Sequence, residues 1–77
     1  MAYEVGFKPA AARQLRRLPD SVQEQILPVI AALAEQPRPT GVVKMAGDED
    51  LYRVRSGNYR IVYEVLDRAL LVVVVKV

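Results

Sequence analysis

Three arginines stand close together in the stretch LYRVRSGNYRIVYEV, which covers residues 51–65. The same stretch holds a single carboxylate, Glu64, so most of this positive charge has no acidic neighbour in the sequence. Guanidinium stays protonated at ordinary pH, and its paired N–H donors fit the oxygens of a phosphate or a carboxylate. Arg53, Arg55 and Arg60 therefore predict an anion-binding site, with a phosphodiester as the first candidate ligand and an acidic protein segment as the competing one.

The same stretch predicts a β-hairpin that presents the three arginines on one face. Apolar residues alternate with basic ones on both sides of the sequence Ser-Gly-Asn, as in strands with one buried face. If a four-residue loop runs from Ser56 to Tyr59, Arg55 lies opposite Arg60. Arg53 then lies opposite Val62. The buried face carries Tyr52, Val54, Ile61, Tyr63 and Val65. A loop shorter by one residue would bury arginines beside valines, so the apolar pattern selects this register.

Two interpretations of this face stay open at the level of sequence. Arginines on an exposed strand commonly keep a protein soluble and discourage pairing of sheet edges, without binding any ligand. Against this, Arg55 and Arg60 are like charges placed directly across the hairpin, which is unfavourable unless an anion lies between them. The arrangement favours a binding function.

The segments before the hairpin must supply the scaffold that positions it. Residues 3–7 alternate as a short strand, and residues 9–18 form a helix that begins at Pro9 and stops before Pro19. Residues 21–36 form a second helix, which starts on the sequence SVQE with the spacing of a capping box.

The segments after the second helix complete a sheet. Residues 42–45 form a short extended piece ahead of the hairpin. Residues 70–77 are apolar except for Lys76, which predicts a strand in the middle of the sheet with both faces covered. The order is β-α-α-β-β-β, an α+β fold in which a helical hairpin packs on one face of a small, mainly antiparallel sheet. The arginines lie on the opposite face.

Composition narrows the class of protein. The chain has 77 residues, 52% of them hydrophobic and 26% charged, which predicts one globular domain over residues 1–77. It has no cysteine and no histidine, so we expect no disulfide, no metal and no cofactor. The N-terminus lacks the pattern of a signal peptide, and the longest apolar run, residues 69–75, is too short to span a bilayer. We expect a cytoplasmic protein that needs a partner chain, because a domain of this size is marginally stable alone.

The other basic residues are weaker candidates than the hairpin arginines for contacts with a polyanion. Arg13, Arg16 and Arg17 cluster on the first helix, and neutralising several phosphates together adds up. Lys44 and Arg38 are single cations, which solvent usually satisfies.

The tyrosines are mostly assigned to packing. Tyr52 and Tyr63 fall on the buried face of the hairpin, and Tyr3 belongs to the first strand pattern. Tyr59 lies in the predicted turn, where its ring can reach a nucleic-acid base.

Over its whole length the chain resembles the RelE/ParE superfamily of bacterial and archaeal toxins from type II toxin–antitoxin modules. The segments that carry the resemblance are KPAAARQLRRLPDSVQEQI, QPRPTGVVKMAG and, most specifically, LYRVRSGNYRIVYEVLDRALLVVVVKV. The chain looks closest to the RelE branch. That resemblance implies an mRNA endonuclease that cuts codons in the ribosomal A site. In that branch the ribose 2′-hydroxyl attacks the adjacent phosphate without a metal, giving a cyclic phosphate and a free 5′-hydroxyl.

The resemblance also implies catalytic roles for the hairpin arginines. Arg60 matches a family arginine in the pattern GxYR, which implies that it binds the scissile phosphate and stabilises the charge of the transition state. Arg53 and Arg55 stand where RelE members carry lysines. Because arginine does not release its proton, we assign both to electrostatic stabilisation and mRNA positioning. RelE-like toxins continue into a tail that supplies a general acid and a stacking tyrosine. This sequence ends at Val77, so we expect weak or absent cleavage from these 77 residues.

The resemblance implies partners as well. These are a cognate antitoxin of RelB type, with a toxin–antitoxin heterotetramer as an expected assembly, and the ribosome with its mRNA. No membrane partner is expected. Two other functions stay open: a ParE-like DNA gyrase poison, which shares the fold and needs no nuclease residues, and a non-toxic remnant that only sequesters an antitoxin.

Overall fold

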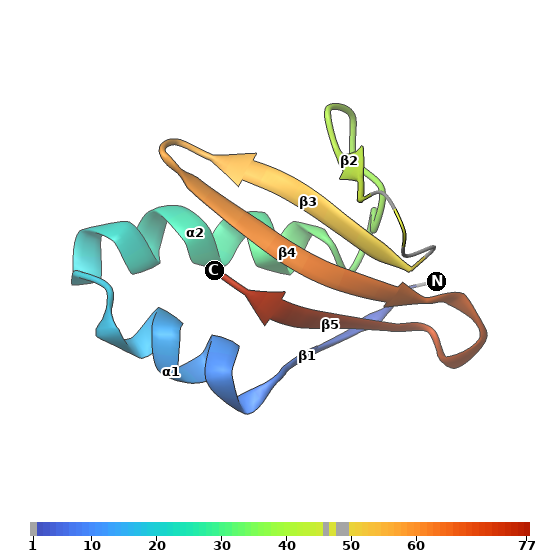
Figure 1. Cartoon of the computed structure of the whole chain (residues 1–77), viewed down its shortest axis with the longest axis horizontal. Coiled ribbons are helices and arrows are strands. Elements are labelled where there is room, and N and C mark those ends of the chain that lie inside the picture. Colours follow the sequence, from blue (N-terminus) through green and yellow to red (C-terminus); the bar gives the residue numbers. More distant parts are fainter. Residues whose placement is uncertain (1, 46, 48–49) are drawn as a thin grey trace.

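Within residues 2–45, 47 and 50–77, which the computed structural model describes, two α-helices and five strands follow one another as β-α-α-β-β-β-β (Figure 1). Their bounds are β1 Glu4–Phe7, α1 Pro9–Arg17, α2 Asp20–Ala32, β2 Val43–Lys44, β3 Leu51–Ser56, β4 Tyr59–Leu66 and β5 Leu71–Lys76, with a 3-10 turn η1 at Asp67–Ala69. No helix in this described part of the chain has the length and apolar character needed to cross a membrane.

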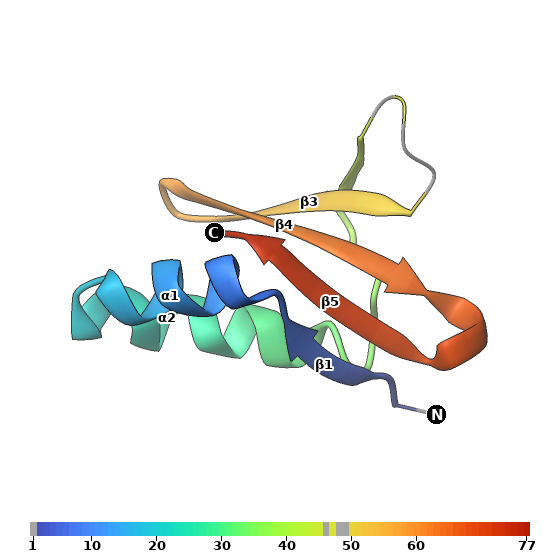
Figure 2. The ribbon, with the colours of Figure 1, turned by 60° about the horizontal axis from the view of Figure 1, so that its bottom comes forward.

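The five strands form one sheet in the order β1-β5-β4-β3-β2. β1 runs parallel to β5, and the other neighbouring pairs are antiparallel. Both α-helices lie on the same side of the sheet (Figure 2). The predicted α+β fold, a helical hairpin on one face of a mainly antiparallel sheet, is confirmed. The extended piece predicted at 42–45 contributes the edge strand β2.

The hydrophobic core fills the space between the helices and the sheet. It consists of buried side chains from both helices, from the residue directly after α2 and from three strands, namely Ala11, Leu15, Ile26, Ile30, Leu33, Tyr52, Ile61, Tyr63, Val65, Val72 and Val74. The buried residues recur every three or four positions on the helices and every second position on β4 and β5. Val54 packs against this core, so the whole predicted apolar face of the hairpin is confirmed.

The β3–β4 hairpin has the predicted register. Arg55 pairs with Arg60, and Arg53 pairs with Val62. This register places the predicted apolar face of both strands toward the helices and the arginines, together with Val62, on the other side of the sheet.

The turn of the hairpin differs from the prediction. Ser56 and Tyr59 still pair with each other, so the predicted four-residue loop is wrong and the turn consists of Gly57 and Asn58 alone. Gly57 has a φ of 58°, the left-handed conformation that a two-residue hairpin turn can require at its first central position. Shortening the loop by two residues instead of one leaves the alternation, and hence the register, intact.

α2 begins and ends earlier than predicted. The helix starts at Asp20, directly after an extended Pro19, and no side chain caps its first turn. The capping box predicted from Ser21 is therefore wrong, because the Pro19 carbonyl already accepts the first helical N–H groups and Ser21 lies inside the helix. At the other end the helix stops at Ala32 and continues as turns, short of the predicted Gln36.

β5 lies between β1 and β4, as predicted for an interior strand. The prediction that both of its faces are covered is wrong. Val72 and Val74 are buried, whereas Val73 and Val75 on the other face are only half-buried. The reason is that both helices pack on the same side of the sheet (Figure 2).

Arg38 fastens the segment after α2 to the turn between β4 and β5. Its guanidinium donates to both carboxylate oxygens of Asp67, at 3.1 and 2.7 Å, and its Nε donates to the Tyr52 hydroxyl at 3.0 Å. The Tyr3 hydroxyl donates to the same carboxylate at 2.6 Å. These hydrogen bonds, from Arg38 first and Tyr3 second, lower the pKa of Asp67 to about 2. Arg38, considered above as a phosphate contact, is paired within the fold.

Candidate nucleic-acid interface

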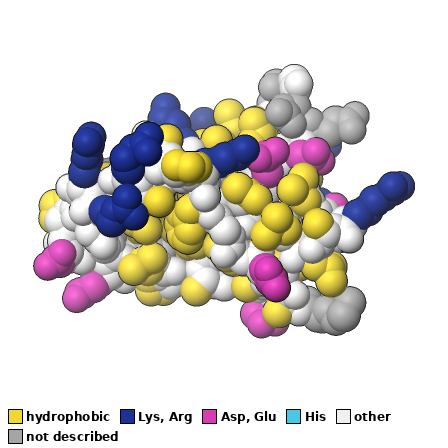
Figure 3. Space-filling view, turned by 90° about the horizontal axis from the view of Figure 1, so that it is seen from below, with side chains coloured by type: hydrophobic (Ala, Val, Ile, Leu, Met, Phe, Trp, Pro, Cys, Tyr) yellow, Lys and Arg dark blue, Asp and Glu magenta, His cyan; other side chains and the backbone are white. Residues whose placement is uncertain are grey.

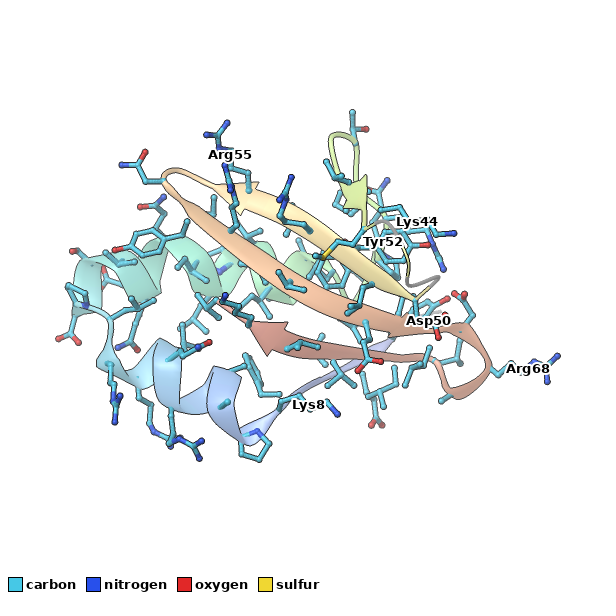
Figure 4. All side chains as sticks on the ribbon, in the orientation of Figure 1. Lys8, Lys44, Asp50, Tyr52, Arg55 and Arg68 are labelled. Atoms are coloured by element: carbon cyan, nitrogen blue, oxygen red, sulfur yellow. The ribbon has the colours of Figure 1, made fainter. Side chains whose placement is uncertain are left out.

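The three hairpin arginines lie together on the side of the sheet away from the helices. We call this surface the arginine face and define it by Arg53, Arg55 and Arg60. Arg53 is half-buried, and the other two are exposed. In Figure 4 Arg55 extends outward from the turn end of the hairpin. β3 and β4 fix this arrangement, because every second residue of both strands is anchored in or against the core.

Two neighbouring hollows open on the arginine face among the described residues. One of about 610 Å³ is lined by cations, aliphatic residues and the turn, namely Met45, Arg53, Arg55, Asn58, Tyr59, Arg60, Val62, Val75, Lys76 and Val77. The other, of about 210 Å³, is lined by Gly41, Val43 and the same three arginines. The larger one has the volume of an ordinary ligand pocket. Its lining suits a ligand that combines negative charge with the flat surface of a ring.

No carboxylate of the described residues pairs with the arginine face. The ion pair recorded in that part of the chain joins Arg38 to Asp67, at a distance of 2.7 Å. Glu64 shares the sheet face of the arginines but lies further along β4, opposite Leu51. Arg60 instead lies directly opposite Arg55, which carries the same charge. The surface therefore has a positive potential that favours an anion.

The structure does not bring Lys44 to the arginine face. Lys44 pairs with Tyr52, whereas its neighbour Val43 pairs with Arg53, so the two residues of β2 belong to opposite sides of the sheet. In Figure 4 Lys44 and Arg55 lie toward opposite ends of β3.

The cluster Arg13, Arg16 and Arg17 is exposed on α1, in the helical layer. Figure 3 shows Lys and Arg side chains gathered toward the left of the molecule, the end that carries both α1 and the β3–β4 turn. The helix cluster and the arginine face are therefore two basic surfaces at one end of the protein.

The tyrosines divide largely as predicted. Tyr52 and Tyr63 are buried and stack with ring centroids 6.0 Å apart. The Tyr63 hydroxyl donates to the Pro37 carbonyl at 2.7 Å, and burial raises the pKa of Tyr63 to about 12. Tyr3 lies just ahead of β1, not within it. Tyr59 packs against the core and also lines the larger hollow, at the edge of the arginine face.

Lys76 lines the larger hollow too, and the sequence pattern did not predict it as a site residue. Strict alternation along β5 would place Lys76 on the buried side with Val72 and Val74. A lysine is poorly suited to a core position, because burying an unpaired charge is costly. A lysine at a position expected to be buried was therefore the one sign in the sequence that Lys76 lies on the other side of the sheet.

The model of a family described as "ParE toxin of type II toxin-antitoxin system, parDE" matches residues 5–77. The chain belongs to this family. The matched residues include both helices and all strands except the first residue of β1, so the arginine face lies entirely within the part of the chain that the family defines.

The proteins that this chain resembles in sequence include RelE and RelE-like toxins. The chain is 35% identical to the mRNA interferase toxin RelE of Escherichia coli K12 over 79 residues, which are 100% of this chain and 82% of that protein. It is 29% identical to a putative RelE-like toxin protein of Escherichia coli over the same shares of both chains. The resemblance to the RelE branch is thereby confirmed.

Solved structures agree with the sequence relatives. The isolated E. coli RelE toxin superposes with a TM-score of 0.87 at 31% identity, covering 97% of this chain and 81% of that one. The toxin in the intact E. coli RelBE complex gives 0.85 at 34% identity, covering 97% and 93%. The archaeal RelE–RelB complex from Pyrococcus horikoshii gives 0.86 at 30% identity, covering 99% and 92%. The chain is a RelE-like toxin, and two of these relatives were crystallised with an antitoxin.

Proposed function

We propose that this toxin is an mRNA interferase that cleaves mRNA in the ribosomal A site without a metal. The observation that carries the proposal is the arginine face, where Arg53, Arg55 and Arg60 line one hollow and have no carboxylate partner among the described residues. A relative at 35% identity is named an mRNA interferase toxin, which supports the same activity. Three neighbouring guanidinium groups suit a phosphodiester, because each presents paired donors to phosphate oxygens.

The chemistry assigned to the arginines is electrostatic. The ribose 2′-oxygen bonds to phosphorus while the bond from phosphorus to the 5′-oxygen breaks, which gives a 2′,3′-cyclic phosphate and a 5′-hydroxyl. Arg60, with Arg55 opposite it, stabilises the negative charge that builds up on the phosphate oxygens. Arg53 holds the mRNA strand in position. All three arginines keep their protons, so the proton lost by the 2′-hydroxyl and the proton gained by the 5′-oxygen pass through other groups, such as water.

The activity is tested by inducing the chain in cells and mapping new mRNA 5′ ends. We expect in-frame cuts within codons, reduced by about 10²–10³-fold in Arg60→Ala, the range seen when one donor to a developing negative charge is removed. Arg68→Ala is the matched control, because Arg68 is exposed in η1, far from Arg55 (Figure 4). Equal cutting by both variants would contradict the role of the arginine face.

The expected partner is an antitoxin that covers the arginine face with acidic residues. The relatives crystallised as RelBE complexes support this pairing. Co-expression with a cognate antitoxin of RelB type should give a stable complex, and its mass by light scattering tests the heterotetramer. Arg55→Glu should weaken the complex if an acidic antitoxin segment contacts this face.

A ParE-like gyrase poison is the second candidate function. The observation in its favour is the matching family model, whose description names a ParE toxin. In the induction experiment it predicts growth arrest with damaged DNA and intact mRNA. Growth without any arrest, in cells that accumulate the folded chain, would instead favour a non-toxic remnant that only binds antitoxin.

A further inference from the structure

A β-bulge in β5 decides which side of the sheet receives Lys76. Tyr63 of β4 pairs with Val74, but the next residue of β4, Val62, pairs with Lys76 instead of Val75. Val75 is thus the extra residue of a bulge, and the alternation of sides shifts by one beyond it. Lys76 shares its side with Val62, which is the side of the arginines.

This shift makes Lys76 the fourth cation around Val62. Arg53 pairs with Val62 from β3 and Lys76 pairs with it from β5, so one row across three strands ends in a cation on each side. Arg55 and Arg60 form the next row. With strands about 4.8 Å apart and same-side residues about 6.8 Å apart, the four Cα atoms occupy a patch of about 10 by 7 Å. All four side chains line the same hollow, so one ligand lying in it can contact them together.

We propose that Lys76 is a phosphate-binding residue, which holds the RNA backbone beside the phosphate that Arg55 and Arg60 bind. The inference rests on the proposed function and adds a residue to its site. Among the described residues Lys76 makes no side-chain hydrogen bond or ion pair, and it is exposed. A single-stranded RNA that crosses the hollow from the hairpin turn toward β5 would meet the arginines first and Lys76 next.

A purely structural role for the bulge explains why Lys76 is outside the core, but not why it lies beside three other cations. The bulge keeps a charge out of the core, which explains why Lys76 does not follow Val72 and Val74 inward. It does not explain why a cation is placed beside three others, where like charges repel each other. A bound polyanion reverses the sign of that interaction, because each added cation then strengthens binding.

Direct binding of the purified chain to a short fluorescent single-stranded RNA tests the proposal. We expect Lys76→Gln to weaken binding roughly tenfold at low salt, as for loss of one charge-assisted contact. The slope of log affinity against log salt should fall in magnitude by about 0.7, the contribution of one phosphate of a single strand. The loss should be equal for uridine-rich and adenosine-rich RNA, because a phosphate contact carries no sequence information.

Three further variants make the outcome specific. Lys76→Arg should keep the affinity, since it retains the charge, and Arg68→Gln should change neither the affinity nor the slope, since Arg68 lies outside the hollow. If Arg60→Ala weakens binding while Lys76→Gln does not, the inference is overturned and the proposed function stands. If neither variant changes binding, the inference is overturned, and the mapping of mRNA 5′ ends decides the proposed function separately. Far-UV circular dichroism verifies that each variant is folded.

Discussion

Replacing Arg60 by threonine should stabilise the free protein, although it damages the site. Arg55 and Arg60 are direct cross-strand partners, and both are exposed. Two unit charges about 7 Å apart in water repel by about 0.6 kcal/mol. This agrees with the roughly 0.2–1 kcal/mol attributed to cross-strand pairs. We expect Arg60→Thr to raise the free energy of unfolding by about 0.5 kcal/mol, and therefore Tm by about 2–4 °C.

Salt separates the charge effect from the strand preference of threonine. Urea unfolding is followed by circular dichroism at about 0.01 M and about 1 M salt, where the Debye length falls from about 30 Å to about 3 Å. The advantage of Arg60→Thr should be present at low salt and shrink at high salt. A cycle of Arg55→Thr, Arg60→Thr and the double variant isolates the coupling, because removing either arginine relieves the same repulsion. Phosphate should raise Tm of the native chain more than that of the variants.

Two results would refute this reasoning. One is a loss of stability in Arg60→Thr at low salt, which would mean that the aliphatic stem of Arg60 packs more than its charge repels. The other is a gain that is equal at both salt concentrations, which would assign it to threonine as a strand former and not to charge.

Substitutions at three other residues test the scaffold. The pKa of Asp67 is lowered to about 2, so the stability that its ionised form adds is present above the ordinary aspartate pKa of about 3.9 and is lost as pH falls toward 2. Asp67→Asn should be less stable at neutral pH and should lack this acid-linked loss when urea midpoints are measured across pH. Tyr63→Phe leaves the Pro37 carbonyl without its donor and should cost about 1 kcal/mol in urea unfolding. It should also remove the tyrosine that ionises near pH 12 in an ultraviolet titration. Gly57→Ala forces a left-handed φ of 58° on alanine and brings its Cβ against the Gln25 side chain. It should cost about 1–2 kcal/mol, and Gly57→Asn, which tolerates this φ, should cost less.

The hairpin register was predictable because its alternatives are so unfavourable. A slip by one residue would turn Arg53 and Arg55 into the core, and an unpaired buried charge costs several kcal/mol. The length of the turn is not restricted in this way. Closing the hairpin with Ser56 paired or unpaired gives the same register, and the choice depends on whether Gly57 adopts a left-handed conformation, which glycine permits but does not require.

The alternation of residue types along β5 could not predict the side of the sheet on which Lys76 lies. It depends on a bulge at the end of β5, and the chain beyond that bulge is held by a contact distant in sequence, in which the Val77 N–H donates to Gln14 of α1 at 3.1 Å. A short stretch of sequence around Lys76 includes neither β4 nor α1, so it could reveal neither the bulge nor this contact. The residues that alternation placed correctly, such as Ile61, sit in regular strands, whereas the missed residue sits where the strand becomes irregular.

The core and the proposed RNA-binding site lie on opposite sides of the same strands. Ile61 is fully buried, and its neighbour Arg60 is exposed on the other side of β4. A substitution at Arg60 or Lys76 therefore changes charge without opening a cavity in the core, so a loss of RNA binding in these variants reports on the site. The repulsion between Arg55 and Arg60 that weakens the free protein is the same interaction that a bound phosphate relieves. The gain in stability and the loss in affinity of Arg60→Thr should accordingly have one electrostatic origin, and added salt should diminish both.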